Sequence, residues 1–386
     1  MAMIRDASSV RRKLRMLLSG EQGTGKSRFA MQFAYFKNPD TGKAFRVLYL
    51  DTETGSIDDY TDELEANGVE PGNVQIIYTQ SLAEVQDFIR AVANNEDIED
   101  ANGNTVLDAD GEPFRADAIV VDSATVLNTT AKQGLTVFSQ KRAKVKATAQ
   151  GLLGDEKAVK IEGAGMELKD YQTLNFKGQS LILDLNASGV NYIVICREKD
   201  EKRTKIVDGK SVSEATGRKI PDGFNGMEYN VNTQIRLYHP ADDNSITMGE
   251  VIKDRSGVHR NGDIVEDPML LEYQVVIDKS AKNKNLSIKN GLNDAVNTEV
   301  KLNMRDLGIE NDEPDDVPAD KSSESKEPSL DDIKKKLNDL IAAASPIKSN
   351  AARKAVKAAG LSTAFRSMTD IEELKKVAAI MEKELA

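Results

Sequence analysis

The sequence contains no tryptophan, one cysteine (Cys196) and two histidines among its 386 residues. A single cysteine excludes an internal disulfide framework, and so few histidines and cysteines exclude a His/Cys zinc site. No apolar run approaches the roughly 20 residues that cross a bilayer, and the first residues lack the apolar core of a signal peptide. We therefore expect a cytoplasmic protein without a membrane partner, in which oxygen ligands hold any metal.

Negative charge is in excess, but it is unevenly placed. The chain has 63 acidic and 52 basic residues and a net charge of -11, of which residues 96–117 contribute -7 and residues 310–328 contribute -6. The remainder is slightly basic, which leaves room for a nucleic-acid-binding surface. Turn signals in residues 96–117 predict a solvated acidic hairpin excursion. Residues 310–328 have almost no large apolar side chains, which predicts a disordered acidic linker.

This linker separates two predicted domains, residues 1–309 and residues 329–386. In the first, apolar runs alternate with helical patterns, which predicts an α/β fold with a mostly parallel twisted sheet and late antiparallel strands. The expected strands are 13–18, 46–50, 74–78, 118–121, 191–196, 233–238, 247–253 and 271–277, and the expected helices include 27–36, 82–93 and 171–187. In the second domain, apolar residues at helical spacing, such as Leu330, Ile333, Leu374 and Val377, predict a helical C-terminal module.

A glycine-rich segment carries the strongest chemical signal. Residues 20–27 match the phosphate-binding pattern G-x-x-x-x-G-K-[ST] between an expected strand and an expected helix. The glycines let main-chain N–H groups surround the phosphates of a nucleotide, and the helix N-terminus adds a positive dipole end. Lys26 would reach the β- and γ-phosphates, and the Ser27 hydroxyl would ligate Mg²⁺. The motif predicts ATP and Mg²⁺ as ligands, with these nucleotide-binding residues: Gly20, Glu21, Gln22, Gly23, Thr24, Gly25, Lys26, Ser27 and Arg28.

Two acidic residues at predicted strand ends complete this site. Asp122 follows the apolar run Ala118-Ile-Val-Val, where a second side chain is needed in the Mg²⁺ shell. Glu53 lies just beyond the strand 46–50, where a carboxylate can orient or deprotonate the attacking water. Acids at such positions also serve as helix caps or lie in solvated turns. Their functional interpretation therefore depends on their pairing with Lys26 and Ser27.

In order and spacing, three segments resemble the RecA-like ATPase core: the glycine-rich segment 20–27, Leu50-Asp-Thr-Glu53 and Val120-Val-Asp122-Ser123. More narrowly, they resemble bacteriophage RecA-like NTP-binding proteins, which include single-strand annealing ATPases. The resemblance covers about residues 12–260. It implies an Mg²⁺-dependent ATPase that assembles into a ring or filament and acts on single-stranded DNA in recombination, annealing or replication.

The same resemblance assigns roles to individual residues. It implies that Glu53 activates water, that Asp122 closes the Mg²⁺ shell, and that Tyr60 stacks on adenine. It also implies that Lys253 and Arg255 reach the nucleotide of the adjacent subunit. The chain departs from the family pattern at one position. The bacterial recombinase of the family has a glutamine there that senses the γ-phosphate, whereas this chain reads Ile195-Cys-Arg-Glu198. Cys196 or Arg197 would have to take that role.

Two basic stretches occupy the positions of the family's DNA-binding loops. Residues 132–160 hold seven bases against two acids, and residues 197–219 hold eight against five. Such clusters favour salt-sensitive binding to a nucleic-acid backbone, although a charged helix and a solvated hairpin would have the same composition. The candidate DNA contacts are Lys141, Arg142, Lys144, Lys146, Lys202, Arg203 and Lys205.

Two other functions remain open from the sequence. A ring-shaped, helicase-like motor would share the same core and would separate strands directionally. A nucleotide-gated interaction module would need ATP only for assembly, so hydrolysis would be dispensable. In either case the helical module at 329–386 is a candidate surface for a protein partner, and the linker would tether it near the ATPase.

Overall fold

The structure is a computed structural model that describes residues 13–207, 210–280, 290–306, 355–357 and 371–385. The chain divides into two compact units, Met1–Val300 and Lys301–Ala386. The predicted linker at 310–328 and the apolar positions Leu330 and Ile333 lie outside the described residues. No helix in the described part of the chain is long and apolar enough to cross a membrane.

The first unit contains a mixed, mostly parallel sheet. Its strand order is β3-β2-β4-β5-β1-β7-β8-β9, and β6 pairs with β5 outside this path. The pairs β1/β5, β1/β7, β2/β3, β2/β4 and β4/β5 are parallel, whereas β5/β6, β7/β8 and β8/β9 are antiparallel. The strands are β1 Arg15–Gly20, β2 Val47–Asp51, β3 Val74–Tyr78, β4 Ala118–Asp122, β5 Asn191–Val207, β6 Lys210–Asp222, β7 Thr233–Tyr238, β8 Met248–Asp254 and β9 Ile264–Glu266.

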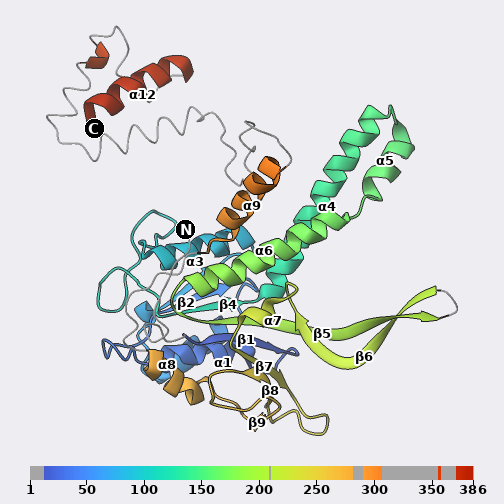
Figure 1. Cartoon of the computed structure of the whole chain (residues 1–386). Coiled ribbons are helices and arrows are strands. Elements are labelled where there is room, and N and C mark those ends of the chain that lie inside the picture. Colours follow the sequence, from blue (N-terminus) through green and yellow to red (C-terminus); the bar gives the residue numbers. More distant parts are fainter. Residues whose placement is uncertain (1–12, 208–209, 281–289, 307–354, 358–370, 386) are drawn as a thin grey trace. The chain divides into compact units, whose positions relative to one another are not determined.

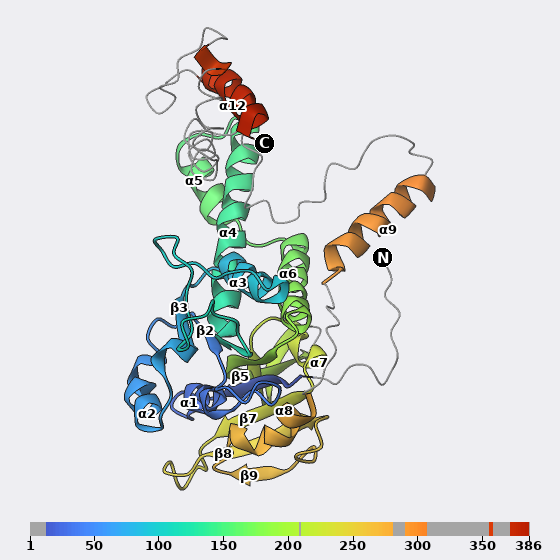
Figure 2. The same ribbon diagram turned by 90° about the vertical axis from the view of Figure 1, so that its left-hand side faces the viewer.

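Helices cover both faces of this sheet (Figures 1 and 2). The α-helices are α1 Lys26–Met31, α2 Thr61–Ala66, α3 Leu82–Asn94, α4 Ala124–Ala149, α5 Gly154–Glu162, α6 Leu168–Ala187, α7 Met227–Asn230, α8 Gln274–Ser280 and α9 Leu292–Asp306. Short 3₁₀ helices are η1 Gln32–Tyr35, η2 Asp58–Tyr60, η3 Pro71–Asn73 and η4 Leu270–Tyr273. The predicted α/β class and the parallel sheet with late antiparallel strands are confirmed.

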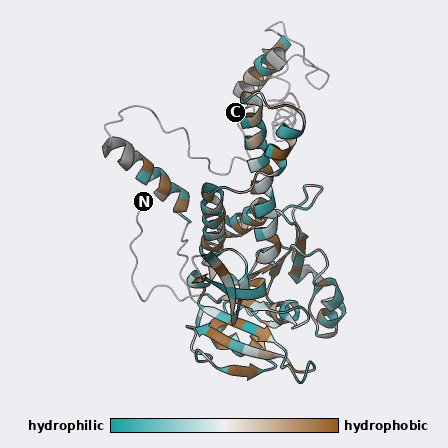
Figure 3. Cartoon of the chain, turned by 90° about the vertical axis from the view of Figure 1, so that its right-hand side faces the viewer, coloured by the Kyte–Doolittle hydropathy of each residue, from teal (hydrophilic) through white to brown (hydrophobic). Residues whose placement is uncertain are grey.

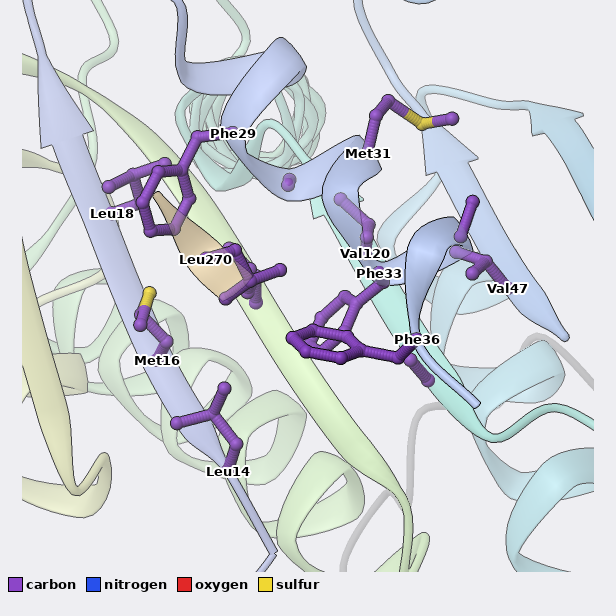
Figure 4. Close-up of a cluster of buried hydrophobic side chains, with 14 of the residues drawn as sticks. Leu14, Met16, Leu18, Phe29, Met31, Phe33, Phe36, Val47, Val120 and Leu270 are labelled. Carbon is purple, nitrogen blue, oxygen red and sulfur yellow. The ribbon is translucent and has the colours of Figure 1, made fainter. Parts of the chain in front are cut away.

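Successive side chains of the central strands point to alternate faces of the sheet, and they form two hydrophobic cores, one on each face. In β1, Met16 and Leu18 face the core beneath α1, η1, η4 and α8, whereas Leu17 faces the core beneath α3, α4, α6 and α7. Successive strand side chains point to opposite faces of a sheet, so one buried strand serves both layers. Figure 4 shows the first core, and Figure 3 shows apolar residues concentrated along the strands.

One predicted strand was wrong. Residues 271–277 form the 3₁₀ helix η4 and the helix α8 instead of an antiparallel strand. The buried side chains there are Leu270, Tyr273, Val276 and Ile277. Their spacing of three, three and one matches the face of a helix and not the alternation of a strand.

The predicted acidic excursion is partly packed against the core. Two isolated antiparallel bridges, Glu99↔Thr105 and Leu107↔Pro113, shape its turns. Ile98 and Phe114 are buried in the second core. The sequence analysis expected a solvated excursion, but the segment packs these two apolar side chains against the sheet and is only partly solvated.

Two long extensions leave the sheet (Figure 1). Helix α4 runs for 26 residues and packs against α5, and α6 returns to the sheet. Strand β5 continues beyond the parallel core and forms an antiparallel hairpin with β6. The predicted strand 191–196 is therefore only the core part of a longer strand.

The second unit contains α12, Ile371–Leu385. Leu374, Val377 and Met381 are fully buried in it. Their spacing of three and four residues is the helical pattern that the sequence predicted for this segment.

Candidate functional site

The carboxyl ends of the parallel strands meet at one edge of the sheet. In register, Gly20 at the end of β1 lies beside Arg197 of β5, and Asp51 at the end of β2 lies beside Asp122 of β4. Ligands of open α/β sheets bind at this edge, because the loops that follow the strands converge there. The sequence-predicted residues of the glycine-rich segment and of both acidic strand ends therefore come together.

The segment Gly20–Ser27 turns from β1 into α1. Gly23 and Gly25 have φ of 81° and 75°, a left-handed conformation that side chains with a Cβ rarely adopt. At Gly20 the constraint is space, because a Cβ would lie 2.3 Å from the carbonyl oxygen of Leu237. Glycine is thus required here by the path of the backbone.

Ser27 and Asp122 form a hydroxyl–carboxylate pair. The Ser27 Oγ donates a hydrogen bond to Asp122 Oδ2 at 2.6 Å, and the same oxygen accepts from Tyr49 Oη at 2.6 Å and Ser56 Oγ at 3.2 Å. Burial raises the pKa of Asp122, and the bonds from Ser27 and Tyr49 oppose this rise. Burial also keeps the pKa of Tyr49 well above its ordinary value, so its phenol remains a donor.

Lys26 lies at the first position of α1. Its ammonium donates a hydrogen bond to the carbonyl oxygen of Glu21 within the same loop. Burial lowers the pKa of Lys26, while Asp122 and Glu53 oppose that change through their negative charge. A bound phosphate would add negative charge beside this partly buried ammonium, beyond that of Asp122 and Glu53.

Glu53 lies in the turn that follows β2. The buried carboxylate of Asp51 organises this turn by accepting hydrogen bonds from the main-chain N–H groups of Glu53, Gly55 and Ser56. The Glu53 Oε1 accepts from Ser123 Oγ at 2.7 Å and from Arg197 Nε at 3.1 Å. Its position is therefore defined by Asp51 at the end of β2, Ser123 directly after β4, and Arg197 of β5.

These side chains enclose a cavity of about 510 Å³. Lys26, Ser27, Glu53, Tyr60 and Asp122 all lie on its wall. Tyr60, at the end of η2, thus lies on the same cavity as the glycine-rich segment, and its contact with adenine stays a prediction. The cavity volume is within the range of small-molecule sites.

A second cavity of about 900 Å³ adjoins the first at Gly25 and is also lined by Thr24 and Arg28. Arg28 is already engaged there, because its guanidinium contacts both carboxylate oxygens of Glu63 at 3.1 to 3.2 Å. Although this cavity is the larger, the smaller one holds the phosphate-binding pattern and both acids. We therefore take the smaller cavity as the candidate functional site.

Lys253 and Arg255 lie at the opposite edge of the sheet. Strand β8 runs antiparallel to β7, so its end pairs with Thr233, next to the beginning of β1. The Lys253 Nζ donates to the carbonyl oxygens of Glu228 at 2.8 Å and Tyr229 at 3.3 Å. Neither residue lines the cavity of its own chain, so a role at a nucleotide would require a neighbouring copy.

Some of the candidate DNA contacts already form ion pairs within the chain, and others do not. On α4, Arg142 pairs with Asp170 and Lys146 pairs with Glu167, whereas Lys141 and Lys144 are exposed. On the hairpin, Lys205 pairs with Glu214. Lys202 and Arg203 are exposed there and have no ion pair within the described part of the chain.

Four residues of the cavity wall had no assigned role in the site predicted from sequence: Ser123, Ile195, Glu198 and Lys219. Arg197 also lines the wall, and the sequence analysis named it, with Cys196, as a candidate for the γ-phosphate-sensing role. Ser123 directly follows Asp122, and Arg197 marks the departure from the family pattern, so both positions carried a signal. Lys219 carried none, because only the hairpin pairing of β5 with β6 returns it to the cavity. Cys196 is fully buried, and burial raises the pKa of its thiol far above the ordinary range.

The residues present fit a magnesium–phosphate ligand. Among the described residues there is no group of three or more His, Cys, Asp or Glu that could hold a metal alone. Mg²⁺ in nucleotide sites needs only one or two protein side chains, because phosphates and water complete its shell. Ser27 and Asp122 supply such a hydroxyl and carboxylate. No family model matches this chain, and no curated protein matches its sequence.

Proposed function

We propose that the chain is an Mg²⁺-dependent ATPase of the RecA-like type that acts on single-stranded DNA as an oligomer. The observation that carries this proposal is the 2.6 Å contact between Ser27 and Asp122 on a cavity that Lys26 and Glu53 also line. A lysine, a hydroxyl and two acids around a glycine-rich turn are the groups that phosphoryl transfer requires. Recombination, annealing and replication are the processes that the family resemblance favours.

In this mechanism each residue has a defined task. Main-chain N–H groups of the glycine-rich turn and Lys26 bind the phosphates, and Tyr60 holds the base. Ser27 and Asp122 would hold Mg²⁺, which neutralises charge on the phosphates when it is bound. Glu53 orients the water whose oxygen forms a bond to the γ-phosphorus, while the bond to the bridging oxygen breaks and its electron pair stays with ADP. The water proton passes to Glu53 and then to the released phosphate.

The hairpin and α4 are the proposed DNA-binding elements. Lys202 and Arg203 on the hairpin, and Lys141 and Lys144 on α4, are exposed cations on extensions that leave the sheet at the edge of the cavity. Exposed cations bind a phosphate backbone without sequence preference. Lys253 and Arg255 would act in a second copy, as their distance from the cis cavity requires.

The test is ATP hydrolysis with and without single-stranded DNA across a salt series. Lys26→Ala should abolish nucleotide binding and turnover. Glu53→Gln should keep binding but lower turnover by about 10² to 10⁴-fold, the range for a lost general base. Glu65→Gln, the same change at an exposed position of α2, is the matched control and should behave as wild type.

The outcomes also separate the rival functions. Hydrolysis that DNA stimulates at low salt, and that is lost in Lys26→Ala, supports the proposal. Recombination or annealing function that Glu53→Gln keeps in full despite its lost turnover would favour a nucleotide-gated module, and directional strand separation would favour a ring-shaped motor. Absence of nucleotide binding by the wild-type protein would refute all three.

A further inference from the structure

Tyr49 connects the core of the sheet to a carboxylate of the candidate site. It lies in the middle of β2, where it pairs in register with Val120 of β4. Asp122 follows Val120 by two residues, so both side chains point to the same face of the sheet. The phenol of Tyr49 spans this diagonal, which an aromatic side chain can reach, and donates a hydrogen bond to Asp122 Oδ2 at 2.6 Å.

The packing of its ring holds Tyr49 in place. Tyr49 is fully buried, in the core cluster that also contains Phe33, Val47 and Val120, which Figure 4 shows. A side chain in a close-packed core cannot change its rotamer without displacing its neighbours. The phenol oxygen is therefore a fixed point from which a hydrogen bond reaches the cavity wall.

Two other hydroxyls donate to the same oxygen of Asp122, but they have different surroundings. Ser27 on α1 and Ser56 in the turn after β2 donate to Oδ2 at 2.6 and 3.2 Å, and both serines are partly exposed. Water can take the place of a partly exposed hydroxyl, whereas a donor enclosed by the core has no such substitute. Within the described part of the chain, the hydrogen bonds to this carboxylate all end on Oδ2, which leaves Oδ1 available to a cation or its water.

We infer that Tyr49 is a positioning residue for Mg²⁺, because it keeps the carboxylate of Asp122 in the orientation in which Asp122 and Ser27 can hold the ion. The inference rests on the proposed function of this cavity. Asp122 is almost fully buried, so its orientation depends on donors in the protein. Groups behind a metal ligand fix its orientation, and their loss typically lowers metal affinity 10- to 100-fold. Tyr49 does not line the cavity, so it acts through Asp122 and not on the nucleotide.

Equilibrium binding of fluorescent ADP, first in excess EDTA and then across a series of Mg²⁺ concentrations, tests this inference without any turnover. In the wild type, Mg²⁺ should tighten the binding of ADP. Tyr49→Phe keeps the ring and removes the hydroxyl. Its affinity in EDTA should stay within about 2-fold of wild type, while the Mg²⁺ concentration at the midpoint should rise by about 10-fold or more. A role in packing alone would leave this midpoint unchanged.

Tyr192→Phe is the matched control. Tyr192 is also fully buried in the sheet, but its phenol donates to Asn186 Oδ1 at 3.0 Å, and neither residue lines the cavity. Both the affinity in EDTA and the Mg²⁺ midpoint should therefore equal those of the wild type. Ser56→Ala removes a donor to Asp122 Oδ2 without changing the core. It should raise the midpoint by less than Tyr49→Phe does, because water can replace the Ser56 hydroxyl.

Two results would overturn the inference. One is a Mg²⁺ midpoint in Tyr49→Phe that equals that of the wild type, and the other is an affinity for ADP that falls equally with and without Mg²⁺. If Tyr49→Phe does not fold, a wild-type midpoint in Ser56→Ala overturns it instead. Failure of the proposed function would differ, because the wild type would then bind no ADP or would show no response to Mg²⁺.

Discussion

Helix α4 and the β5–β6 hairpin both leave the sheet at the edge of the candidate nucleotide cavity, but they use their cations differently. On α4, Arg142 is committed to Asp170 and Ser139, and Lys146 contacts Glu167. On the hairpin, Lys202 and Arg203 project from a solvated ribbon and have no ion pair in the described part of the chain. Among the candidate DNA contacts, each extension thus keeps two exposed cations, and the difference lies in how the others are paired: Arg142 is held by the buried Asp170, whereas Lys205 contacts the exposed Glu214.

The comparison teaches that a count of basic residues measures potential contacts and not available ones. Asp170 on α6 is buried, with 5% of its side chain exposed, and Arg142 supplies its charge partner. A buried carboxylate without such a partner is strongly destabilising. Arg142 therefore serves the packing of α4 against α6, and we expect it to be unavailable to DNA.

The largest effect should come from reversing charge on the hairpin. Lys202→Glu combined with Arg203→Glu should lower the affinity for single-stranded DNA by about 100-fold at low salt, because two cations are lost and two repelling anions are added. Fluorescence anisotropy with a labelled oligonucleotide measures this change. Nucleotide binding should be unaffected, since neither residue lines the cavity. The comparison would be reversed if this variant lost less DNA affinity than the α4 variant that combines Lys141→Glu with Lys144→Glu.

Arg142→Ala should affect stability and not DNA binding. Removing the guanidinium leaves Asp170 buried without its ion pair, so thermal unfolding should shift down by about 5 °C. Lys141→Ala, one residue away on an exposed position, should change the unfolding temperature by less than about 1 °C. A large loss of DNA affinity with unchanged unfolding temperature would show that Arg142 belongs to the DNA surface.

The pH dependence of this difference provides a further test. The hydrogen bond from Arg142 lowers the pKa of Asp170 below its ordinary value of 3.8. The ion pair therefore contributes fully above pH 3.8 and is lost as the pH falls through the lowered pKa. The gap in unfolding temperature between wild type and Arg142→Ala should be constant from pH 7 to about pH 5 and should shrink below pH 4. Glu167 adds to this change in the same direction, because Arg142, after Lys169, also lowers its pKa.

The same contrast explains which parts of the molecule could be predicted from the sequence. Gly20–Ser27, Glu53 and Asp122 were predictable because strand ends of a parallel sheet meet at one edge, so local patterns define a shared location. The pairing of Arg142 with Asp170 was not predictable, because Asp170 lies 28 residues away on another helix. The contact of Arg197 with Glu53 spans 144 residues and depends on the register of β5 beside β1. Segment 271–277 was missed because its apolar side chains were interpreted as a strand despite their helical spacing.

The smallest effect should come from the exposed cations of α4. Lys141→Glu combined with Lys144→Glu should lower DNA affinity by about 5-fold, less than the hairpin pair, because Asp170 and Glu167 pair with Arg142 and Lys146 and lower the positive potential around α4. The slope of log affinity against log salt concentration shows whether DNA contacts the hairpin alone or both extensions. Each lost phosphate contact reduces that slope by about 0.7 on a single strand. A reduced slope for the hairpin variant with an unchanged slope for the α4 variant would place the DNA on the hairpin, whereas equal reductions would place it across both extensions.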